Sequence, residues 1–306
     1  MQSLLMISSL ILQLAKGIWF IEPASAAAYK PVVQAILTGK NVDFSGLMPK
    51  SYKDDGGDSE RKPIQTFVYS TSVSGSTPRT ETFGELSKAP QGSIAVTPLH
   101  GVVMKEDFCG APGTKTLSAL MELADGSPNI SAHILHTDSP GGSANAMFDM
   151  TEVLKRLNKP VLTFVDGMMA SAAYGIGSTS KHIMASHAMN SIGSIGTYIT
   201  LYDYAKAMEM EGIREITIYA TKSTEKNADY RAALDGDEKP MLATVDKYNE
   251  AFLSVVRRNR FSKNLNESET LKGQLHFTPE ALSSGLIDSV GSFPEAIQKV
   301  QSLLKP

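Results

Sequence analysis

Hydrophobic runs alternate with helical patterns along the chain from about residue 92 onwards. Short apolar runs predict strands at residues 93–99, 133–137 and 160–165. Between these runs, apolar residues recur at the spacing of an α-helix over residues 115–124 and 144–157. Strands that alternate with helices in this way are typical of parallel βαβ units, so the pattern predicts an α/β fold.

The alternation continues to the end of the chain. The pattern predicts further strands at residues 182–184 and 215–219, and helices at residues 170–180, 201–211, 237–256, 279–284 and 294–303. No internal repeat is visible. We therefore expect one principal domain over residues 91–306.

Two different segments precede this domain. Residues 51–90 are rich in Asp, Gly, Ser, Thr and Pro and predict a polar linker, within which self-cleavage is an open question. Residues 1–50 predict an N-terminal helical segment. Its apolar run at residues 4–14 is shorter than the roughly 18 residues of a membrane-spanning helix. The first basic residue, Lys16, follows that run, so we expect a packing helix rather than a cleaved signal or a stable membrane span.

The net charge and the cysteine content of the chain limit which partners and cofactors we expect. A net charge of −3 gives no electrostatic reason to expect nucleic acid. The lone cysteine, Cys109, excludes an intramolecular disulfide and a multi-cysteine metal site, which fits a reducing compartment such as the cytoplasm. Cys109 also has no histidine near it in the sequence, so we expect a packing role rather than a catalytic one.

Two clusters of small residues follow predicted strands, one at residues 138–143 and one at residues 166–174. Ligands collect at the carboxyl ends of strands in open α/β sheets, so both clusters should face one crevice. The backbone N–H groups of Gly141 and Gly142 are candidates for an oxyanion hole, although Pro-Gly-Gly is also an ordinary tight turn. Ser171 begins a helix and is either a nucleophile or an N-cap.

A serine nucleophile needs a base. None of the six histidines stands in an obvious catalytic loop; they are His100, His133, His136, His182, His187 and His276. Lys222 and Lys226 are better placed, because they follow the predicted strand at residues 215–219. A lysine there could deprotonate Ser171 if burial lowered its pKa, whereas a solvated loop lysine could not.

Three segments occur in an order that resembles the signal peptide peptidase A family and its phage relatives, the capsid or prohead proteases. They are Ser139-Pro140-Gly141-Gly142, residues 166–174 and residues 191–197, and the resemblance extends over about residues 90–300. It implies a crotonase-like α/β fold of ββα units and a Ser-Lys dyad without metal or organic cofactor. It also implies self-assembly into a homo-oligomeric ring.

Carried onto this chain, the resemblance makes Ser171 the nucleophile and Ser194 the serine that orients the lysine. Thr221 stands in place of the glycine that precedes the family's lysine, and the strictly aligned position is Thr224. Lys222 and Lys226 flank that position; Lys226 is favoured and Lys222 stays open.

The expected function is that of a serine endopeptidase, prophage-encoded and cytoplasmic, that matures capsid or scaffold protein. A signal-peptide-degrading peptidase is the alternative within the family, and a catalytically inactive structural homologue is the alternative if both lysines face solvent. An acyl-CoA enzyme on the same fold would need a carboxylate near Ser171, for which only Asp166 is available. A Clp-type protease would need a histidine where Ser194-Ile195-Gly196 stands.

Overall fold

The computed structural model describes residues 19–21, 67–70, 79–82, 86–107, 111–201, 203, 205–214 and 216–304. Cys109 and most of the predicted helical segment and polar linker lie outside these residues. Domain boundaries at residues 50 and 90 therefore stay predictions.

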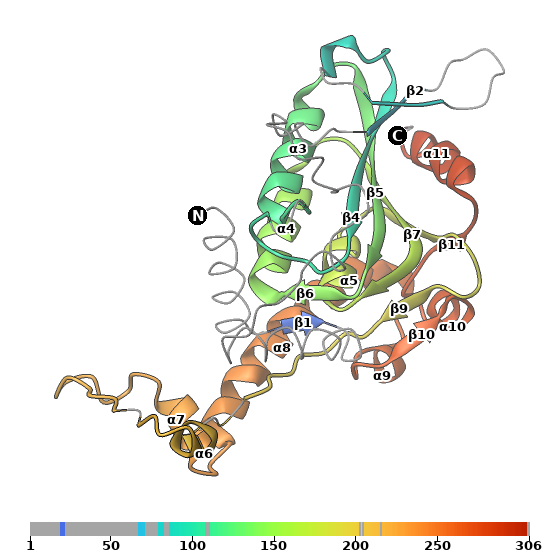
Figure 1. The fold of residues 1–306 in the computed structure, drawn as a ribbon. Helices are drawn as coiled ribbons and strands as arrows, with labels where there is room; N and C mark the ends of the chain where they lie inside the picture. Colours follow the sequence, from blue (N-terminus) through green and yellow to red (C-terminus); the bar gives the residue numbers. More distant parts are fainter. Residues whose placement is uncertain are drawn as a thin grey trace.

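Three parallel strands form the centre of the main sheet: β4 (Ser93–His100), β5 (Ile130–Ser139) and β7 (Val161–Ala170). The crossover helices α3 (Thr114–Gly126) and α4 (Ala144–Arg156) lie side by side on one face, and α11 (Phe293–Ser302) covers the other (Figure 1). β5 is followed by the short strand β6 (Gly141–Ser143) and then α4, which is one ββα unit. The predicted α/β class is confirmed, and the chain contains a ββα unit of the kind expected from the sequence.

The end of β7 is shared by two further strands. β8 (His182–Ala185) pairs with the first half of β7, and β9 (Ser191–Gly193) pairs with the last three residues, placing Gly193 opposite Ala170. Both pairings are parallel. The sheet therefore brings residues 191–193 to the point where β7 ends and the next helix begins.

Described residues of the predicted N-terminal segments form strands. β2 (Phe67–Ser70) and β3 (Arg79–Thr82) pair with each other, and β2 pairs antiparallel with β4. These residues extend the sheet rather than serve as a structureless linker. β1 (Trp19–Ile21) lies within the segment expected to be helical, yet it is extended and pairs with β6.

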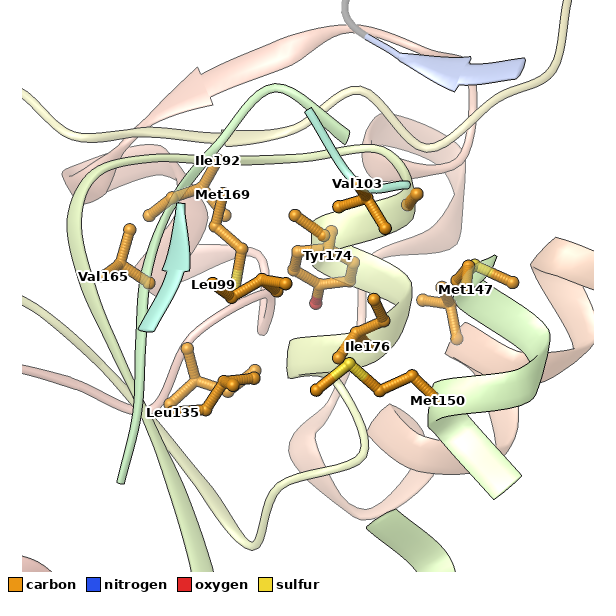
Figure 2. Packing of buried hydrophobic residues seen from close by; sticks show 14 of the residues in the cluster. Leu99, Val103, Leu135, Met147, Met150, Val165, Met169, Tyr174, Ile176 and Ile192 are labelled. Carbon is orange, nitrogen blue, oxygen red and sulfur yellow. The ribbon is translucent and has the colours of Figure 1, made fainter. Parts of the chain in front are cut away.

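The main core lies between the sheet and the helices α3, α4, α5 (Ala172–Gly177) and α8 (Lys239–Arg260). All six residues of α5 are buried (Figure 2). A Cβ built on Gly175 would lie 2.2 Å from Sδ of Met147, so only glycine lets α5 approach α4 this closely. The hydroxyl of Tyr174 donates to the carbonyl of Leu286 at 2.9 Å, and burial raises the pKa of this phenol. Core packing thus holds α5 rigidly against the sheet.

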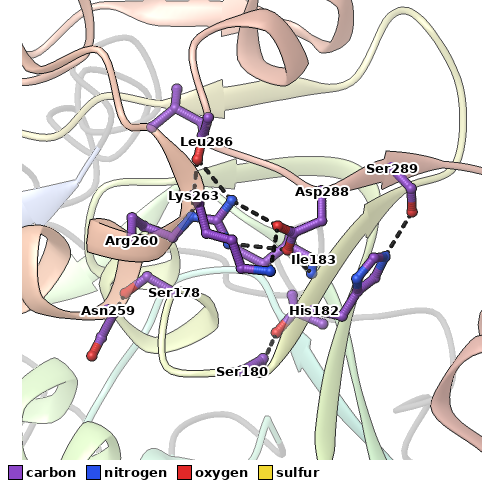
Figure 3. Close-up of polar contacts among 12 residues, drawn as sticks. Ser178, Ser180, His182, Ile183, Asn259, Arg260, Lys263, Leu286, Asp288 and Ser289 are labelled. Carbon is purple, nitrogen blue, oxygen red and sulfur yellow. Dashed lines mark hydrogen bonds and ion pairs between the residues drawn. The ribbon is translucent and has the colours of Figure 1, made fainter. Parts of the chain in front are cut away.

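A buried ion pair ties the last part of the chain to this core (Figure 3). Arg260 is fully buried; its guanidinium donates to Asp288 at 3.0 and 3.1 Å and to the carbonyl of Gly285 at 2.7 and 3.0 Å. Burial by itself raises the pKa of Asp288, but hydrogen bonds from Arg260 and the Ile183 amide outweigh it and hold that pKa below its usual range. The pair joins α8 to the residue before β11, and the Asp288 carboxylate also accepts from the Ile183 N–H of β8 at 2.7 Å.

Shorter elements complete the described chain. They are η2 (Leu86–Lys88), α6 (Ala205–Met210), α7 (Ala228–Leu234), η3 (Phe261–Lys263), α9 (Glu267–Thr270), β10 (Leu275–Phe277), α10 (Thr278–Ser283) and β11 (Ser289–Val290). β10 pairs with β9, and β11 pairs with β8. None of the described helices is long and apolar enough to cross a membrane.

One stretch, which we call the arm, projects from the body. The arm comprises the described residues between 205 and 242, including α6, α7 and the start of α8 (Figure 1). The prediction of a strand at residues 215–219 is wrong for its described residues, which pair with no strand. Ile216 and Ile218 alternate as in a strand, but they are 69% and 89% exposed because no core lies beneath them.

Candidate active site

Ser171 stands at the sharp turn between β7 and α5. Its backbone has φ 53° and ψ −117°, a conformation that costs a non-glycine residue about 1–3 kcal/mol. The Ser171 N–H donates to the carbonyl of Gly193 at 2.8 Å, and its carbonyl accepts from Gly175 at 2.9 Å. Strain of this kind persists only where the surroundings hold it, as at the strand-to-helix turns that present nucleophilic serines in other folds.

The Ser171 hydroxyl has no hydrogen-bond partner in the described part of the chain. Ser171 is 1% exposed, and its Oγ is buried without a hydrogen bond to any described residue. The residue occupies the N-cap position of α5, yet its side chain makes no capping bond, so the N-cap interpretation is wrong. Leaving a buried hydroxyl unsatisfied costs about 1–3 kcal/mol. Such a group calls for a functional explanation.

Ser194 lies beside Ser171, as expected from the sequence. The two serines directly follow Ala170 and Gly193, which are paired residues of neighbouring parallel strands. Ser194 also has a positive φ, 51°, and its N–H donates to the carbonyl of Gln274 at 2.8 Å. The tertiary structure therefore brings these two predicted site residues to the same end of the sheet.

Gly141 and Gly142 form most of β6, which lies against α5 (Figure 1). Ser139 is fully buried; its Oγ accepts from the Gly141 N–H at 3.2 Å and donates to the carbonyl of Gly101 at 2.6 Å. The Gly141 N–H therefore already has a partner. A Cβ on Gly142 would lie 2.1 Å from the carbonyl oxygen of Val103, so this position admits only glycine.

The two candidate lysines lie far from this turn. Lys222 and Lys226 are exposed and precede α7 on the arm. Figure 1 places the arm away from α5, the helix that follows Ser171. Within one copy of the chain, the structure brings together Ser171, Ser194 and the glycines but does not add Lys222 or Lys226 to them.

A histidine that the sequence did not single out lies next to Gly193, the residue before Ser194. His276 is in β10, opposite Ile192 of β9. A Cβ built on Gly193 would lie 3.2 Å from Cδ2 of His276, so the imidazole contacts this glycine. Its Nε2 is buried without a hydrogen-bond partner among the described residues. No local signal marks it, because the antiparallel pairing of β9 with β10 joins segments more than 80 residues apart.

The other histidines make different contacts. His133 bonds to Asp125 at 3.3 Å, and His182 to the hydroxyl of Ser289 at 2.8 Å. His100 bonds to His136 at 3.0 Å; burial, and then the neighbouring His136, lower the pKa of His100. None of the hydrogen bonds found in the described part of the chain links a histidine to Ser171, so no Ser-His-Asp arrangement is assembled there.

Asp166 has a bracing role. Its carboxylate accepts from the Ser186 hydroxyl at 3.2 Å and lies 3.4 Å from Nε2 of His136, with half of its side chain exposed. Asp138 supports the same turn by accepting from the Met168 N–H at 3.0 Å. The described residues contain no group of three or more His, Cys, Asp or Glu side chains placed to hold a metal ion.

Comparison with known proteins finds a family model and several proteins that are similar to this chain. The model of the family described as peptidase family S49 matches residues 154–305, a range that includes Ser171, Ser194 and both lysines but begins after Gly142. Protease 4 of Haemophilus influenzae is 28% identical over 216 residues, which cover 69% of this chain and 35% of that protein. Capsid assembly protease C of Escherichia phage lambda is 23% identical over 222 residues, covering 69% and 49%.

A solved structure of a membrane-bound stomatin-specific protease, 1510-N, aligns at a TM-score of 0.43 and 18% identity, covering 69% of this chain and 85% of that one. The chain spans 35% and 49% of the length of the two sequence relatives. The resemblance expected from the sequence, to the signal peptide peptidase A family and its phage branch, is confirmed.

Proposed function

From this relationship to peptidase family S49, we propose that the protein is a serine endopeptidase that hydrolyses peptide bonds with a Ser-Lys dyad. The observation that carries the proposal is the Ser171 hydroxyl, which is buried on a strained strand-to-helix turn and has no hydrogen-bond partner among the residues that the structure describes. A hydroxyl of this kind is free to hydrogen-bond to a catalytic base. A nucleophilic role therefore explains why the burial and the backbone strain at this turn are tolerated.

In the proposed reaction, Ser171 Oγ attacks the carbonyl carbon of the peptide bond while a neutral lysine amine takes the hydroxyl proton. The lysine returns this proton to the leaving amine, and water then hydrolyses the ester on Ser171. The Gly142 N–H is the proposed donor to the developing oxyanion, because the Gly141 N–H is held by Ser139. Ser194 is proposed to orient the lysine.

We propose that the lysine comes from a neighbouring copy of the chain. The arm that carries Lys222 and Lys226 exposes large apolar side chains, which a contact between copies would bury. They include Met210, Ile213, Ile216, Ile218, Tyr230, Leu234 and Leu242. A contact between the arm of one copy and the Ser171 site of the next joins two different surfaces, and such contacts generate rings when the rotation closes. Lys226 is the favoured base and Lys222 the second candidate.

Mixing two inactive variants tests this proposal. Ser171→Ala and Lys226→Ala are each expected to lose cleavage of casein, and refolding them together should restore about a quarter of the wild-type activity. That fraction follows because one site in four receives an intact serine from one copy and an intact lysine from the next. Lys222→Ala is the matched control and should stay active alone.

The outcomes separate the alternatives. Loss with Lys222→Ala instead of Lys226→Ala would exchange the roles of the two lysines. Activity that stays lost after the two inactive variants are refolded together would contradict a site shared between copies. A folded wild-type protein that cleaves nothing would favour a structural subunit, a reading that the exposure of both lysines in one copy supports. His276→Gln addresses the only histidine found beside Gly193 in the described chain; loss equal to that of Ser171→Ala would favour a histidine base.

We propose capsid or scaffold protein as the substrate, which would place the activity in the cytoplasm during virion assembly. The support is the similarity to proteins named capsid assembly protease C and head-tail preconnector protein. The similarity to Protease 4 and to a signal peptide peptidase supports signal peptides as the second candidate. Cleavage of a co-expressed capsid protein, encoded next to this chain, is compared with cleavage of a synthetic signal peptide. The faster reaction decides between the two candidate substrates.

A further inference from the structure

The N-terminal strand β1 lies on the proposed active site. Trp19, Phe20 and Ile21 pair antiparallel with Ser143, Gly142 and Gly141, in that order. Ile21 is only 6% exposed, so its side chain is buried in this position. A segment from near the start of the sequence therefore covers one edge of β6, the strand that carries the proposed oxyanion donor.

The other edge of β6 is occupied by Val103. The Val103 N–H donates to the carbonyl of Gly141, and the Ser143 N–H donates to the carbonyl of Val103, both at 2.8 Å. Backbone groups alternate in direction along an extended strand, so the N–H and C=O of Gly142 face the opposite edge, where Phe20 lies. The residue with the proposed oxyanion role is thus the one that β1 covers.

We propose that β1 is a built-in competitor that occupies the edge of β6 on which an extended peptide substrate pairs. This inference rests on the proposed function, because it assigns the edge beside Ser171 to the peptide that Ser171 cleaves. Adding a strand to an open sheet edge is a common way to bind peptides, and backbone hydrogen bonds supply much of the affinity. The three-residue strand β1 pairs through backbone groups, so this pairing does not depend on a particular side-chain sequence.

Competition within one chain has a quantitative consequence. A segment of the same chain competes at an effective concentration that is set by the connection that tethers it, and not by the protein concentration. If β1 is bound most of the time, the apparent affinity for a peptide falls by the fraction of molecules in which the edge is free. Weakening β1 should therefore tighten peptide binding without changing any residue of β6 or α5.

A binding experiment on the full chain tests this without requiring catalysis. A fluorescent peptide with the sequence of residues 17–23 is titrated into Ser171→Ala and into Ser171→Ala with Ile21→Asp, and anisotropy reports the Kd. The charged side chain cannot take the buried position of Ile21. We expect at least about tenfold tighter binding to the double variant. Leu123→Asp, on the exposed face of α3, is the matched control and should leave the Kd unchanged.

Equal affinity for the two proteins, or binding to neither, would overturn the inference. Ile21→Ala is a milder second variant, expected to shift the Kd in the same direction by a smaller factor. Hydrogen exchange gives an independent readout: excess peptide should accelerate exchange of the amides of residues 19–21 in Ser171→Ala, and unchanged exchange with bound peptide would contradict displacement. Casein cleavage by the wild type reports the proposed function separately.

Discussion

Ser171 and Ser194 both have a positive φ at the ends of two paired strands, 53° and 51° respectively. The residues before them, Ala170 and Gly193, are register partners, and the Ser171 N–H donates to the Gly193 carbonyl. The two turns therefore support each other. Both carry strain that a glycine would relieve, which indicates that the serine side chains are retained for a reason other than stability.

Removing the Ser171 hydroxyl should stabilise the fold. Ser171→Ala eliminates a buried oxygen without a partner, so the free energy of unfolding should rise by about 1 kcal/mol. Urea denaturation measures the change. Ser178→Ala is the control, because the Ser178 Oγ donates to the Gly175 carbonyl and accepts from Asn259; its loss should lower the free energy of unfolding by about 1 kcal/mol. A destabilised Ser171→Ala would contradict an unpaired hydroxyl.

Activity should rise with pH if a lysine is the base. Only the neutral amine can accept the proton of Ser171, so kcat/KM for peptide cleavage should increase from about pH 6 to about pH 9. A stopped assay across this range, with unfolding monitored by circular dichroism, measures the profile. A flat profile counts against a lysine base, and a plateau reached near pH 7 would indicate a histidine.

The glycine between α4 and α5 should tolerate no side chain. Gly175→Ala adds a Cβ 2.2 Å from Sδ of Met147 and 3.0 Å from Phe252, and such overpacking costs about 1–3 kcal/mol. Met147→Ala in the same protein should recover part of this loss, since it removes the closest atom. Gly126→Ala, which meets nothing within 4 Å, is the control and should not destabilise. Urea denaturation of the wild type, Gly175→Ala, Met147→Ala and the double variant gives the coupling energy. Additive losses would exclude the contact.

The buried ion pair should be far more important for stability than an exposed one. Arg260→Met leaves Asp288 buried without its main partner, and breaking a buried pair from one side costs about 3–5 kcal/mol. Arg257→Met is the matched control in the same helix; its pairs with Glu250 and Glu267 are exposed, so at most about 1 kcal/mol should be lost. Comparable losses in both variants would show that burial of the pair has no special effect.

Acid should destabilise the fold through His182. Burial lowers the pKa of His182 to about 4, whereas the unfolded chain titrates near 6.5. The unfolded state therefore binds more protons between these two values, and stability falls as the pH decreases from 6.5 towards 4. His182→Gln should reduce the loss of Tm between pH 7 and pH 5 by roughly 2–4 °C. His187→Gln, at an exposed position, should leave that loss unchanged.

Much of this architecture could be predicted from the sequence because it depends on local patterns. The apolar runs of β4, β5 and β7 and the helical periodicity of α3 and α4 are set by residues a few positions apart. The small-residue clusters can also be recognised in the sequence, and the positive φ of Gly141 after β5 is one that favours glycine. These clusters contain Ser171, Gly141 and Gly142, whereas Ser194 was assigned only from the family resemblance.

Other features of the fold and of the candidate site depend on contacts between distant segments, so only the tertiary structure decided them. Strand periodicity in residues 216–219 predicted a strand, but a strand forms only where a partner edge and a core are available, and the arm offers neither. The pairing of β1 with β6 and the place of His276 beside Gly193 join segments far apart in the chain. The exposure of Lys222 and Lys226 is likewise set by the direction of the arm. Local periodicity determines which face of an element is apolar, but packing between distant segments determines what that face meets.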